Sequence, residues 1–388
     1  MNKIKDIFHK FIAWFASRIN GNPSARIIVI GVTGTKGKSM TSELIKTVLE
    51  SQGDKAAVLN SVHEAIGSQE YPNPTPNTMP GRGHIQFFLA KAVREGAKYA
   101  VIEVASQGVV QYRHENIEWD GGVFMNIHPE HIESHGNFEN YREAKLEFFR
   151  YAALSPKENK RFFINKDDQS AELFAEAAGD NEKKFFSGTF IKANYAAAEA
   201  VGRAYGIREE NIKKALEEFK GLPGRMETVY EKDFRIIVDY AHTPDSLNEA
   251  YNAASLPLRI REVNSEQKSG KLICVLGSAG GGRDKWKRSK MGEVASKHCN
   301  IAIVTNEDPY DEDPMEIMEA VASGIRDGGK EPILMIDREE AIEKAVSLAE
   351  RGERKSDCSG GERRRGNDYR KGERKIYPPC EGAKTFLV

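Results

Sequence analysis

A short loop near the start of the chain has the residue types and spacing of a phosphate-binding site. It reads TGTKGKS and comprises Thr33, Gly34, Thr35, Lys36, Gly37, Lys38 and Ser39. Glycines let the backbone turn sharply and point N–H groups at an anion. The positive end of a following helix would add to this attraction. We expect Lys38 to reach the β- and γ-phosphates of ATP and Ser39 to offer its hydroxyl to Mg²⁺.

The loop departs from the strict pattern G-x-x-x-x-G-K-[ST], because Val32 stands at its first glycine position. A glycine turn formed by chance is the alternative. The apolar run before the loop and the helical pattern after it argue against chance, because phosphate loops join a strand to a helix. We therefore predict that residues 33–39 bind the nucleotide.

Two more side chains stand where such a site would need metal ligands. Glu103 lies near the carboxyl end of a predicted strand, and His131 follows the end of another. Open α/β sheets bind their ligands outside the carboxyl ends of the strands. Taken alone, Glu103 is more often a solvated strand-end residue and His131 a loop hydrogen-bonding group.

The elements that must position these residues alternate between buried strands and amphipathic helices. Predicted strands cover residues 26–32, 56–59, 99–104 and 122–126, and predicted helices cover residues 39–51, 83–95 and 141–151. This spacing indicates a parallel sheet covered on both faces. The predicted class is α/β, with a central parallel-sheet ATPase domain of the P-loop type.

The pattern begins again after residue 223, with strands at residues 234–239, 271–276, 300–305 and 332–336. Helices at residues 245–253 and 314–323 separate some of these strands, which indicates a second, Rossmann-like α/β domain. We predict an amphipathic N-terminal helix in residues 1–24, a central nucleotide-binding domain in 25–222 and a C-terminal domain in 223–388. The glycine-rich stretch 221–224 is the expected boundary.

Composition excludes several classes of protein. The 388 residues carry 57 Lys and Arg against 58 Asp and Glu, which argues against nucleic-acid binding. Four cysteines without a CxxC pair favour reduced thiols in a cytoplasmic protein over disulfides or a zinc site. Residues 3–19 form a basic amphipathic pattern, which fits either contact with a membrane surface or packing on protein.

Several segments in order along the chain resemble the Mur ligase family. They are residues 33–39, 103–108 (EVASQG), 126–145 (NIHPEHIESHGNFENYREAK), 223–227 (PGRME), 239–244 (DYAHTP) and 280–288 (GGGRDKWKR). The resemblance is strongest to the ligases that add the third residue of the peptidoglycan peptide. It implies that ATP phosphorylates a carboxylate and that an amine then attacks the acyl phosphate to form an amide.

The resemblance also implies roles for individual residues. Ser39, Glu103 and His131 match Mg²⁺ ligands, and Lys145 matches a lysine that the family carbamylates. Lys38, His131, Lys145 and Arg283 are the catalytic residues implied, with Arg283 facing the incoming amino acid. The implied contacts with the rest of ATP are Asn194, Asp239 and His242 at the base and ribose, and Arg225 and Lys285 near the phosphates. Residues 77–80 (NTMP) resemble a segment near the carboxylate substrate.

The sequence departs from the family in ways that bear on the substrates. The loop begins at residue 33, which leaves no room before it for the domain that holds the uridine diphosphate sugar. Residues 186–194 are too short for several central strands of the family. Gln107 replaces a histidine. Tyr310 replaces the arginine of an Asp-Asn-Pro-Arg motif, which removes the bidentate clamp expected for diaminopimelate.

The tail after about residue 351 is rich in Arg, Lys and Gly, as in a solvated basic tail. The family would place a strand and a Gly-Lys-Gly-x-Glu loop there. We hypothesise a reading-frame shift near Arg351, because suitable codons for residues 355–360 read one base later give Lys-Val-Ile-Val-Ala-Gly. The nucleotide sequence tests this hypothesis.

The function expected from the sequence is a cytoplasmic, ATP-dependent acid–amino-acid ligase in peptidoglycan peptide synthesis. Its substrates would be a muropeptide-like carboxylate and an amino acid. One alternative is a ligase like folylpolyglutamate synthase. Another is a nucleotide-binding partner subunit without catalysis.

Overall fold

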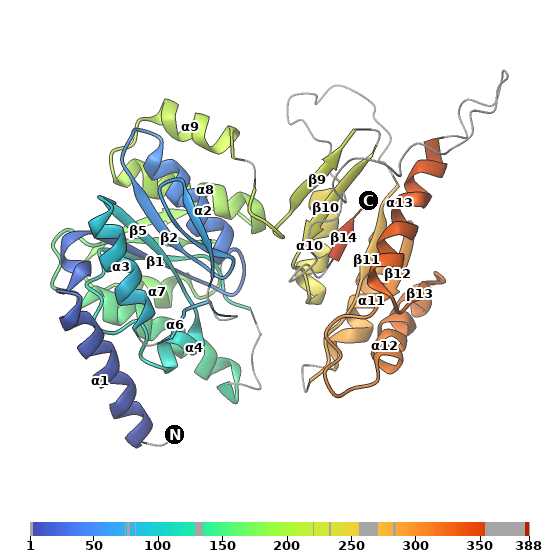
Figure 1. Ribbon diagram of the computed structural model, residues 1–388, viewed down its shortest axis with the longest axis horizontal. Coiled ribbons are helices and arrows are strands. Elements are labelled where there is room, and N and C mark those ends of the chain that lie inside the picture. Colours follow the sequence, from blue (N-terminus) through green and yellow to red (C-terminus); the bar gives the residue numbers. More distant parts are fainter. Residues whose placement is uncertain are drawn as a thin grey trace. The chain divides into compact units, whose positions relative to one another are not determined.

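The computed structural model describes residues 3–73, 75, 78–81, 83–128, 135–219, 221–232, 234–255, 271–281, 285–353 and 385–387. The chain divides into two compact units, Met1–Phe219 and Lys220–Val388, and each unit has its own sheet (Figure 1). The division falls beside the glycine-rich stretch 221–224. Among the described residues, no helix has the length and apolar character needed to cross a membrane.

The first unit is built on an eight-stranded sheet of order β4-β3-β2-β5-β1-β6-β7-β8. Its strands are β1 Ile28–Thr33, β2 Ala56–Leu59, β3 His63–Ile66, β4 Gln69–Pro72, β5 Tyr99–Val104, β6 Gly121–Phe124, β7 Arg161–Asn165 and β8 Glu182–Phe186. All neighbours from β2 to β8 run parallel, and β3 and β4 add an antiparallel hairpin at one edge. The central strands are almost wholly buried, which explains their continuous apolar runs.

Helices cover both faces of this sheet (Figure 1). The helices are α1 Lys3–Ile19, α2 Lys38–Glu50, α3 His84–Arg94, α4 Ser106–Val110, α6 Phe138–Ala153, α7 Ala171–Ala177, α8 Phe190–Ala204 and α9 Glu209–Glu217, with a 3₁₀ turn η1 Pro23–Arg26. One core joins the sheet to α3, α4, α6 and α7, and the other joins it to α2, α8 and α9. Helix α8 follows β8 closely, in agreement with the short stretch noted in the sequence.

The second unit has a six-stranded sheet of order β13-β12-β11-β14-β10-β9. Its strands are β9 Glu227–Glu231, β10 Arg235–Asp239, β11 Ile273–Leu276, β12 Ile301–Thr305, β13 Ile333–Met335 and β14 Thr385–Leu387. Helices α10 Pro244–Ala254, α11 Lys287–His298 and α12 Pro314–Asp327 pack on one face, and α13 Arg338–Glu353 packs on the other. The predicted α/β class is thereby confirmed, with a large and mostly parallel central sheet between helices.

Strand β14 was not predicted, and it fills the middle of the second sheet. It pairs antiparallel with both β10 and β11, and its Leu387 is almost fully buried. The Thr385 hydroxyl donates a hydrogen bond of 2.9 Å to the carbonyl oxygen of Ala241. Residues 354–384, which include the segment of the frame-shift hypothesis, lie outside the described residues.

The expectation of reduced cysteines is wrong for Cys274 and Cys299, which form a disulfide. Cys274 lies on β11, and Cys299 follows α11 and precedes the neighbouring strand β12. The search for short CxxC spacing missed this pair because the fold, and not local sequence, brings the two side chains together. Cys358 and Cys380 lie outside the described residues.

Candidate nucleotide site

The phosphate loop, residues 33–39, leaves the carboxyl end of β1, between the ends of β5 and β6. The helix that follows it, α2, begins at Lys38, so the free N–H groups of its first turn lie at the loop. Gly37 has a φ of +81°, and a Cβ at this position would lie 2.4 Å from the side-chain oxygen of Asn194 on α8. Asn194 therefore packs directly on the loop, and only glycine fits at position 37.

Asn126, just after β6, fixes the middle of the phosphate loop. Its side-chain oxygen accepts a hydrogen bond of 2.9 Å from the N–H of Lys36, and its amide nitrogen donates one of 3.1 Å to the Lys36 carbonyl. Its own carbonyl accepts a bond of 2.9 Å from the N–H of Thr35. Three hydrogen bonds from one residue hold the loop in a single backbone conformation.

The loop is also tied to α6. The hydroxyl of Thr35 lies 3.0 Å from the hydroxyl of Tyr141 and accepts a bond of 2.9 Å from the N–H of His128. The Lys145 ammonium is buried and donates a bond of 2.7 Å to the carbonyl oxygen of Gly34. It also lies 4.7 Å from the centre of the Tyr141 ring. Lys145 is thus an interior residue that contacts the loop, and not a surface lysine.

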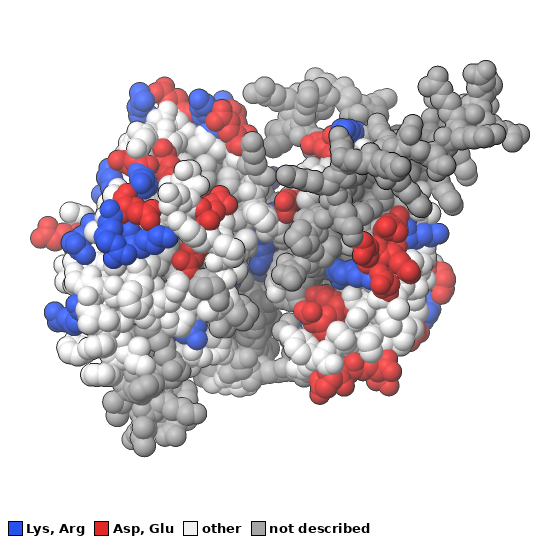
Figure 2. Space-filling view, viewed as in Figure 1, with Lys and Arg blue, Asp and Glu red and all other residues white. Residues whose placement is uncertain are grey.

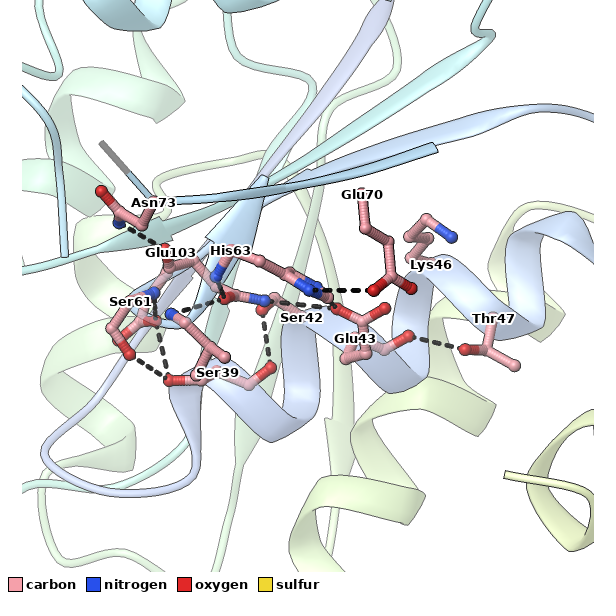
Figure 3. Close-up of polar contacts among 12 residues, drawn as sticks. Ser39, Ser42, Glu43, Lys46, Thr47, Ser61, His63, Glu70, Asn73 and Glu103 are labelled. Atoms are coloured by element: carbon pink, nitrogen blue, oxygen red, sulfur yellow. Dashed lines mark hydrogen bonds and ion pairs between the residues drawn. The ribbon is translucent and has the colours of Figure 1, made fainter. Parts of the chain in front are cut away.

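Ser39 and Glu103 meet beside the loop (Figure 3). The Ser39 hydroxyl donates a hydrogen bond of 2.8 Å to Oε2 of Glu103, and the N–H of Ser61 donates one of 2.9 Å to the same oxygen. The hydroxyls of Ser39 and Ser61 lie 2.9 Å apart. The Lys38 ammonium lies 3.8 Å from Oε1 of Glu103 and donates a bond of 3.0 Å to the carbonyl oxygen of Thr35. A buried carboxylate, a hydroxyl and a cation therefore converge at the end of β1.

The carboxylate of Glu43, which lies on α2, helps to hold this arrangement (Figure 3). Oε2 of Glu43 lies 2.9 Å from Nε2 of His63 and accepts a bond of 3.2 Å from the Asn60 side chain. Asn60 and Ser61 are adjacent in the turn between β2 and β3. This turn therefore bonds to Glu43 through Asn60 and to Glu103 through Ser61, which fixes the Glu103 carboxylate relative to α2.

The donors at this point fit a hard divalent cation. Carboxylate and hydroxyl oxygens are the ligands that Mg²⁺ prefers in proteins, and here Glu103 and Ser39 supply them within hydrogen-bond distance of each other. Within the described ranges, no three His, Cys, Asp or Glu side chains gather as a complete metal site. His131, the third predicted ligand, lies outside the described residues.

The same edge of the sheet carries two other predicted segments. Nε2 of His135 lies 3.1 Å from the Ser106 hydroxyl and 3.4 Å from the side-chain nitrogen of Gln107, at the start of α4. A Cβ on Gly108 would lie 2.3 Å from the Met79 sulfur, so the segment that includes Thr78 and Met79 packs against α4. Asn77 lies outside the described residues.

In the second unit, three predicted residues cluster around the end of β10. Asp239 accepts hydrogen bonds of 2.8 Å from the N–H groups of Met226 and Ala241. Burial raises the pKa of the Asp239 carboxyl, and the Arg225 guanidinium and these N–H groups oppose that rise. Arg225 stacks over the Tyr240 ring at 4.1 Å, and Nδ1 of His242 lies 2.9 Å from the Tyr240 carbonyl oxygen.

Two loops of the second unit pack on each other at the ends of β11 and β12. A Cβ on Gly280 would lie 2.2 Å from the Pro309 carbonyl oxygen, and one on Gly281 would lie 2.8 Å from the Tyr310 ring. The Lys285 ammonium lies 2.9 Å from a carboxylate oxygen of Glu312. Arg283 lies outside the described residues. An aromatic ring thus covers the glycine loop at the position where the resembling motif has an arginine.

Within each unit, the structure brings several of the predicted site residues together. In the first unit, Glu103, Lys145 and Asn194 all contact the phosphate loop. Arg225, Asp239 and His242 form a separate group in the second unit. Sequence reasoning missed Asn126, Tyr141 and Ser61 as loop-holding residues. Position after a strand was the available signal for Asn126, while no local pattern indicated Ser61.

Comparison with known proteins gives the same family for both units. The model of the "Mur ligase middle domain" matches residues 32–221, and that of the "Mur ligase, glutamate ligase domain" matches residues 224–354. The UDP-N-acetylmuramoyl-L-alanyl-D-glutamate--2,6-diaminopimelate ligase of Syntrophomonas wolfei is 34% identical over 382 residues, covering 88% of this chain and 75% of the relative. The UDP-N-acetylmuramyl-tripeptide synthetase of Treponema denticola is 32% identical, covering 89% and 74%.

Solved structures agree with this result. A structure of a UDP-N-acetylmuramoyl-L-alanyl-D-glutamate--2,6-diaminopimelate ligase has a TM-score of 0.54 at 27% identity, covering 81% of this chain and 69% of that one. A Mycobacterium tuberculosis folylpolyglutamate synthase complexed with ADP and AMPPCP has a TM-score of 0.67 at 14% identity, covering 89% and 90%. The second likeness concerns the fold alone.

Proposed function

The chain belongs to the Mur ligase family, and we propose that it joins a muropeptide-like carboxylate to an amino acid at the expense of ATP. The reaction is that of an ATP-dependent, amide-forming ligase. The observation that carries the proposal is the phosphate loop at the end of β1, held by Asn126 and bordered by Lys38, Ser39 and Glu103. Fold alone would not separate this function from that of a folylpolyglutamate synthase.

The proposed reaction has two steps. A carboxylate oxygen of the acceptor attacks the γ-phosphorus of ATP, and ADP leaves. The amine nitrogen of the amino acid then attacks the acyl carbon and loses a proton, and phosphate leaves with one of the original carboxylate oxygens. The first step brings a carboxylate close to the anionic phosphates, and the second develops negative charge on the acyl oxygen. Cations and preorganised N–H donors are therefore the expected means of catalysis.

We assign the phosphates to residues 33–39 and the first turn of α2. Asn126 and Tyr141 hold the loop so that its N–H groups are aimed before the nucleotide arrives, which lowers the reorganisation needed on binding. Lys38 supplies the charge at the β- and γ-phosphates, and Asn194 supports the loop at Gly37. Arg225, Asp239 and His242 are the proposed contacts with the base and ribose.

Ser39 and Glu103, together with His131, are the residues that would hold Mg²⁺. When bound, Mg²⁺ supplies positive charge that offsets the charge on the phosphates in the transition state. Glu103 stays in place through the N–H of Ser61, so its position does not depend on the ion alone. Lys38 stands next to the same carboxylate and neutralises part of its charge.

We propose that Lys145 is carbamylated in the active enzyme. Its burial against the phosphate loop supports this role, because a carbamate there would place an anion beside this loop. The test is the activity of Lys145→Ala, which we expect to be restored in part by added short-chain carboxylates. The variant Lys157→Ala, which loses an ion pair with Asp120 away from the loop, serves as the control.

The amine substrate is proposed to be an amino acid other than diaminopimelate. Tyr310 stands where the resembling motif has an arginine, and its ring lies against Gly281. A tyrosine ring cannot make the two parallel hydrogen bonds by which a guanidinium holds a carboxylate. Arg283 is the proposed contact with the α-carboxylate of the incoming amino acid.

The proposed function is tested by a screen that detects both ADP and the amide product by mass spectrometry. The acceptors are a UDP-muramoyl dipeptide and a reduced folate, each offered with the proteinogenic amino acids and diaminopimelate in the presence of ATP and Mg²⁺. We expect product only with the muramoyl acceptor, and less with diaminopimelate than with the preferred amino acid. Product from folate and glutamate would support the folate alternative, and ATP binding without product from any pair would support a non-catalytic subunit.

A further inference from the structure

Helix α1 is packed on the first unit with its small side chains inward. Ala13, Ala16 and Ser17 are buried, whereas Phe11, Trp14, Phe15 and Ile19 have exposed fractions of 56%, 45%, 50% and 59%. An amphipathic helix that only completes a core does the opposite, because its largest apolar side chains gain most from leaving water. The outward face of α1 is therefore unexplained by the fold of the unit.

The contacts that hold α1 leave Phe11, Phe15 and Ile19 at least half exposed. The helix packs against α3, and a Cβ on Gly83 at the start of α3 would lie 3.5 Å from the Cβ of Ala16. The Lys10 ammonium lies 3.0 Å from a carboxylate oxygen of Glu115 and 4.3 Å from the Tyr112 ring centre. These attachments fix the rotation of the helix, so the exposed aromatic face is a built feature of the surface.

Three of the exposed side chains, Phe11, Trp14 and Phe15, form a connected aromatic cluster. The ring centroids of Phe11 and Phe15 lie 6.1 Å apart, and those of Phe11 and Trp14 lie 5.9 Å apart. Phe87 of α3 is also exposed, and its ring and Ala16 both lie within 4 Å of the position that a Cβ of Gly83 would take. Figure 2 shows mainly uncharged surface over the described part of α1. We call Phe11, Trp14, Phe15, Ile19 and Phe87 the aromatic face.

The charge of α1 favours one class of partner. The sequence of this 17-residue helix contains Lys3, Lys5, Lys10 and Arg18 but a single acidic residue, Asp6. The whole chain, by contrast, has a net charge of −1. Aromatic and aliphatic side chains on one side of a helix, accompanied by lysine and arginine, are the pattern of helices that lie in the interface of an anionic bilayer.

We propose that α1 docks the first unit on an anionic membrane surface, with the helix parallel to the membrane plane and the aromatic face among the acyl chains near the headgroups. The helix is about 25 Å long at 1.5 Å per residue, and it offers a row of anchors along this length. Arg18, which is exposed on the same helix, would lie at the level of the lipid phosphates. This inference goes beyond the proposed ligase activity and does not depend on it.

The experiment is flotation of the full-length protein with vesicles of phosphatidylglycerol and phosphatidylcholine, and with vesicles of phosphatidylcholine alone. The test variant is the double substitution Phe11→Ser and Phe15→Ser. The matched control is Phe185→Ser on β8, which removes an aromatic side chain with a similar exposed fraction, 54%, from another element of the same unit. Both side chains of the test variant are exposed, so circular dichroism and the melting temperature should stay at the wild-type values.

We expect wild type and Phe185→Ser to float with the anionic vesicles, and the double variant to bind them at least about tenfold more weakly, because buried apolar area drives interfacial binding. Wild type should also bind vesicles of phosphatidylcholine alone at least about tenfold more weakly than the anionic vesicles, because phosphatidylcholine has no net charge to attract the basic residues of α1. In a Trp286→Phe background only Trp14 and the buried Trp119 remain, so membrane binding should shift the tryptophan emission to the blue through Trp14, and brominated acyl chains should quench the Trp14 part.

Two results would overturn the proposal. One is equal flotation of wild type and the double variant, which would mean that the aromatic face does not carry membrane binding. The other is no flotation of wild type together with a dimer in sedimentation that the double variant loses, which would make the aromatic face a contact between copies of this chain.

Discussion

The two units hold their site residues in different ways. In the first unit, residues from several elements hold one loop. Asn126 after β6 and Tyr141 and Lys145 on α6 hydrogen-bond to it, and Asn194 on α8 packs against Gly37. In the second unit, the bonds of Asp239 and His242 are mainly to backbone groups. Their partners are neighbours in the chain, or Met226 near the domain junction. A loop fixed from several sides is preorganised for the phosphates, whereas residues held locally can adjust as a nucleotide or an amine enters.

The sheets differ in a related way. The centre of the first sheet is β1, a six-residue strand that runs parallel to both of its neighbours. The centre of the second sheet includes β14, a three-residue strand from the far end of the chain that runs antiparallel to its neighbours. The stability of the second unit therefore depends on three residues that are distant in sequence from the strands they join.

Removing the ammonium of Lys38 should give the largest effect. Lys38→Met keeps the length of the side chain but loses the charge next to Glu103 and the phosphates. We expect kcat/KM for ATP to fall by about a thousandfold or more, because charge placed at the transferring phosphoryl group acts mainly in the transition state. Steady-state phosphate release measures it. A loss of less than about tenfold would mean that the loop does not carry the chemistry.

Disrupting β14 should affect the second unit alone. Leu387→Asp places a charge at a buried position between β10 and β11. We expect the free energy of unfolding of this unit to fall by about 3 kcal/mol or more, as for other unpaired charges in a core. Urea unfolding should resolve a separate early transition. Leu154→Asp, at an exposed position of the first unit, should leave both transitions unchanged.

Removing the side chain of Asn126 should loosen the phosphate loop without unfolding its unit. Asn126→Ala loses two side-chain hydrogen bonds to Lys36. We expect ATP to bind more weakly by about 2 kcal/mol, or about thirtyfold, because the loop N–H groups are no longer fixed before binding. Titration calorimetry measures it. Asn181→Ala, which loses bonds near β8, should bind ATP as wild type does, and equal binding by both variants would contradict preorganisation.

The smallest effect concerns His114 and the pH dependence of stability. Burial lowers the pKa of the His114 imidazole from its usual value near 6.5 to about 3. Between these values the unfolded chain takes up a proton that the folded chain does not, so stability is lost as the pH falls. From pH 6.5 to 5.5 this loss is about 1 kcal/mol. Urea unfolding at both values should show a shallower pH dependence for His114→Gln, and identical slopes would contradict a neutral buried imidazole.

Much of this structure could be predicted from local patterns in the sequence. The continuous apolar run before Thr33 predicts a buried central strand, and the loop and helix after it give the position of the proposed phosphate site. Glu103 could be predicted because it ends a strand that neighbours β1. The structure has this strand, loop and helix, and it places Glu103 beside the loop. These positions could be predicted because each depends on residues that are near one another in the chain or on a general rule of parallel sheets.

Other features depend on contacts that no local pattern reports. Ser61 bonds to Glu103 only because the turn between β2 and β3 reaches the end of β5. Strand β14 takes its place from residues far along the chain, and the disulfide joins residues separated by 25 positions. The aromatic face of α1 is a different case. The helical spacing of its apolar residues could be seen in the sequence, but the spacing does not tell whether that side of the helix is buried or exposed. Only the packing of α1 on the first unit shows that this side is exposed.

The central claim is that this chain activates a carboxylate by transferring the γ-phosphoryl group of ATP to it. The most direct measurement uses an acceptor with ¹⁸O in the reacting carboxylate and follows the isotope in the phosphate released during amide formation. The account predicts that each phosphate carries one ¹⁸O atom from the acceptor, since that oxygen forms the acyl phosphate bond. Phosphate that contains only oxygen from ATP and water would show that the carboxylate is never phosphorylated and would contradict the account.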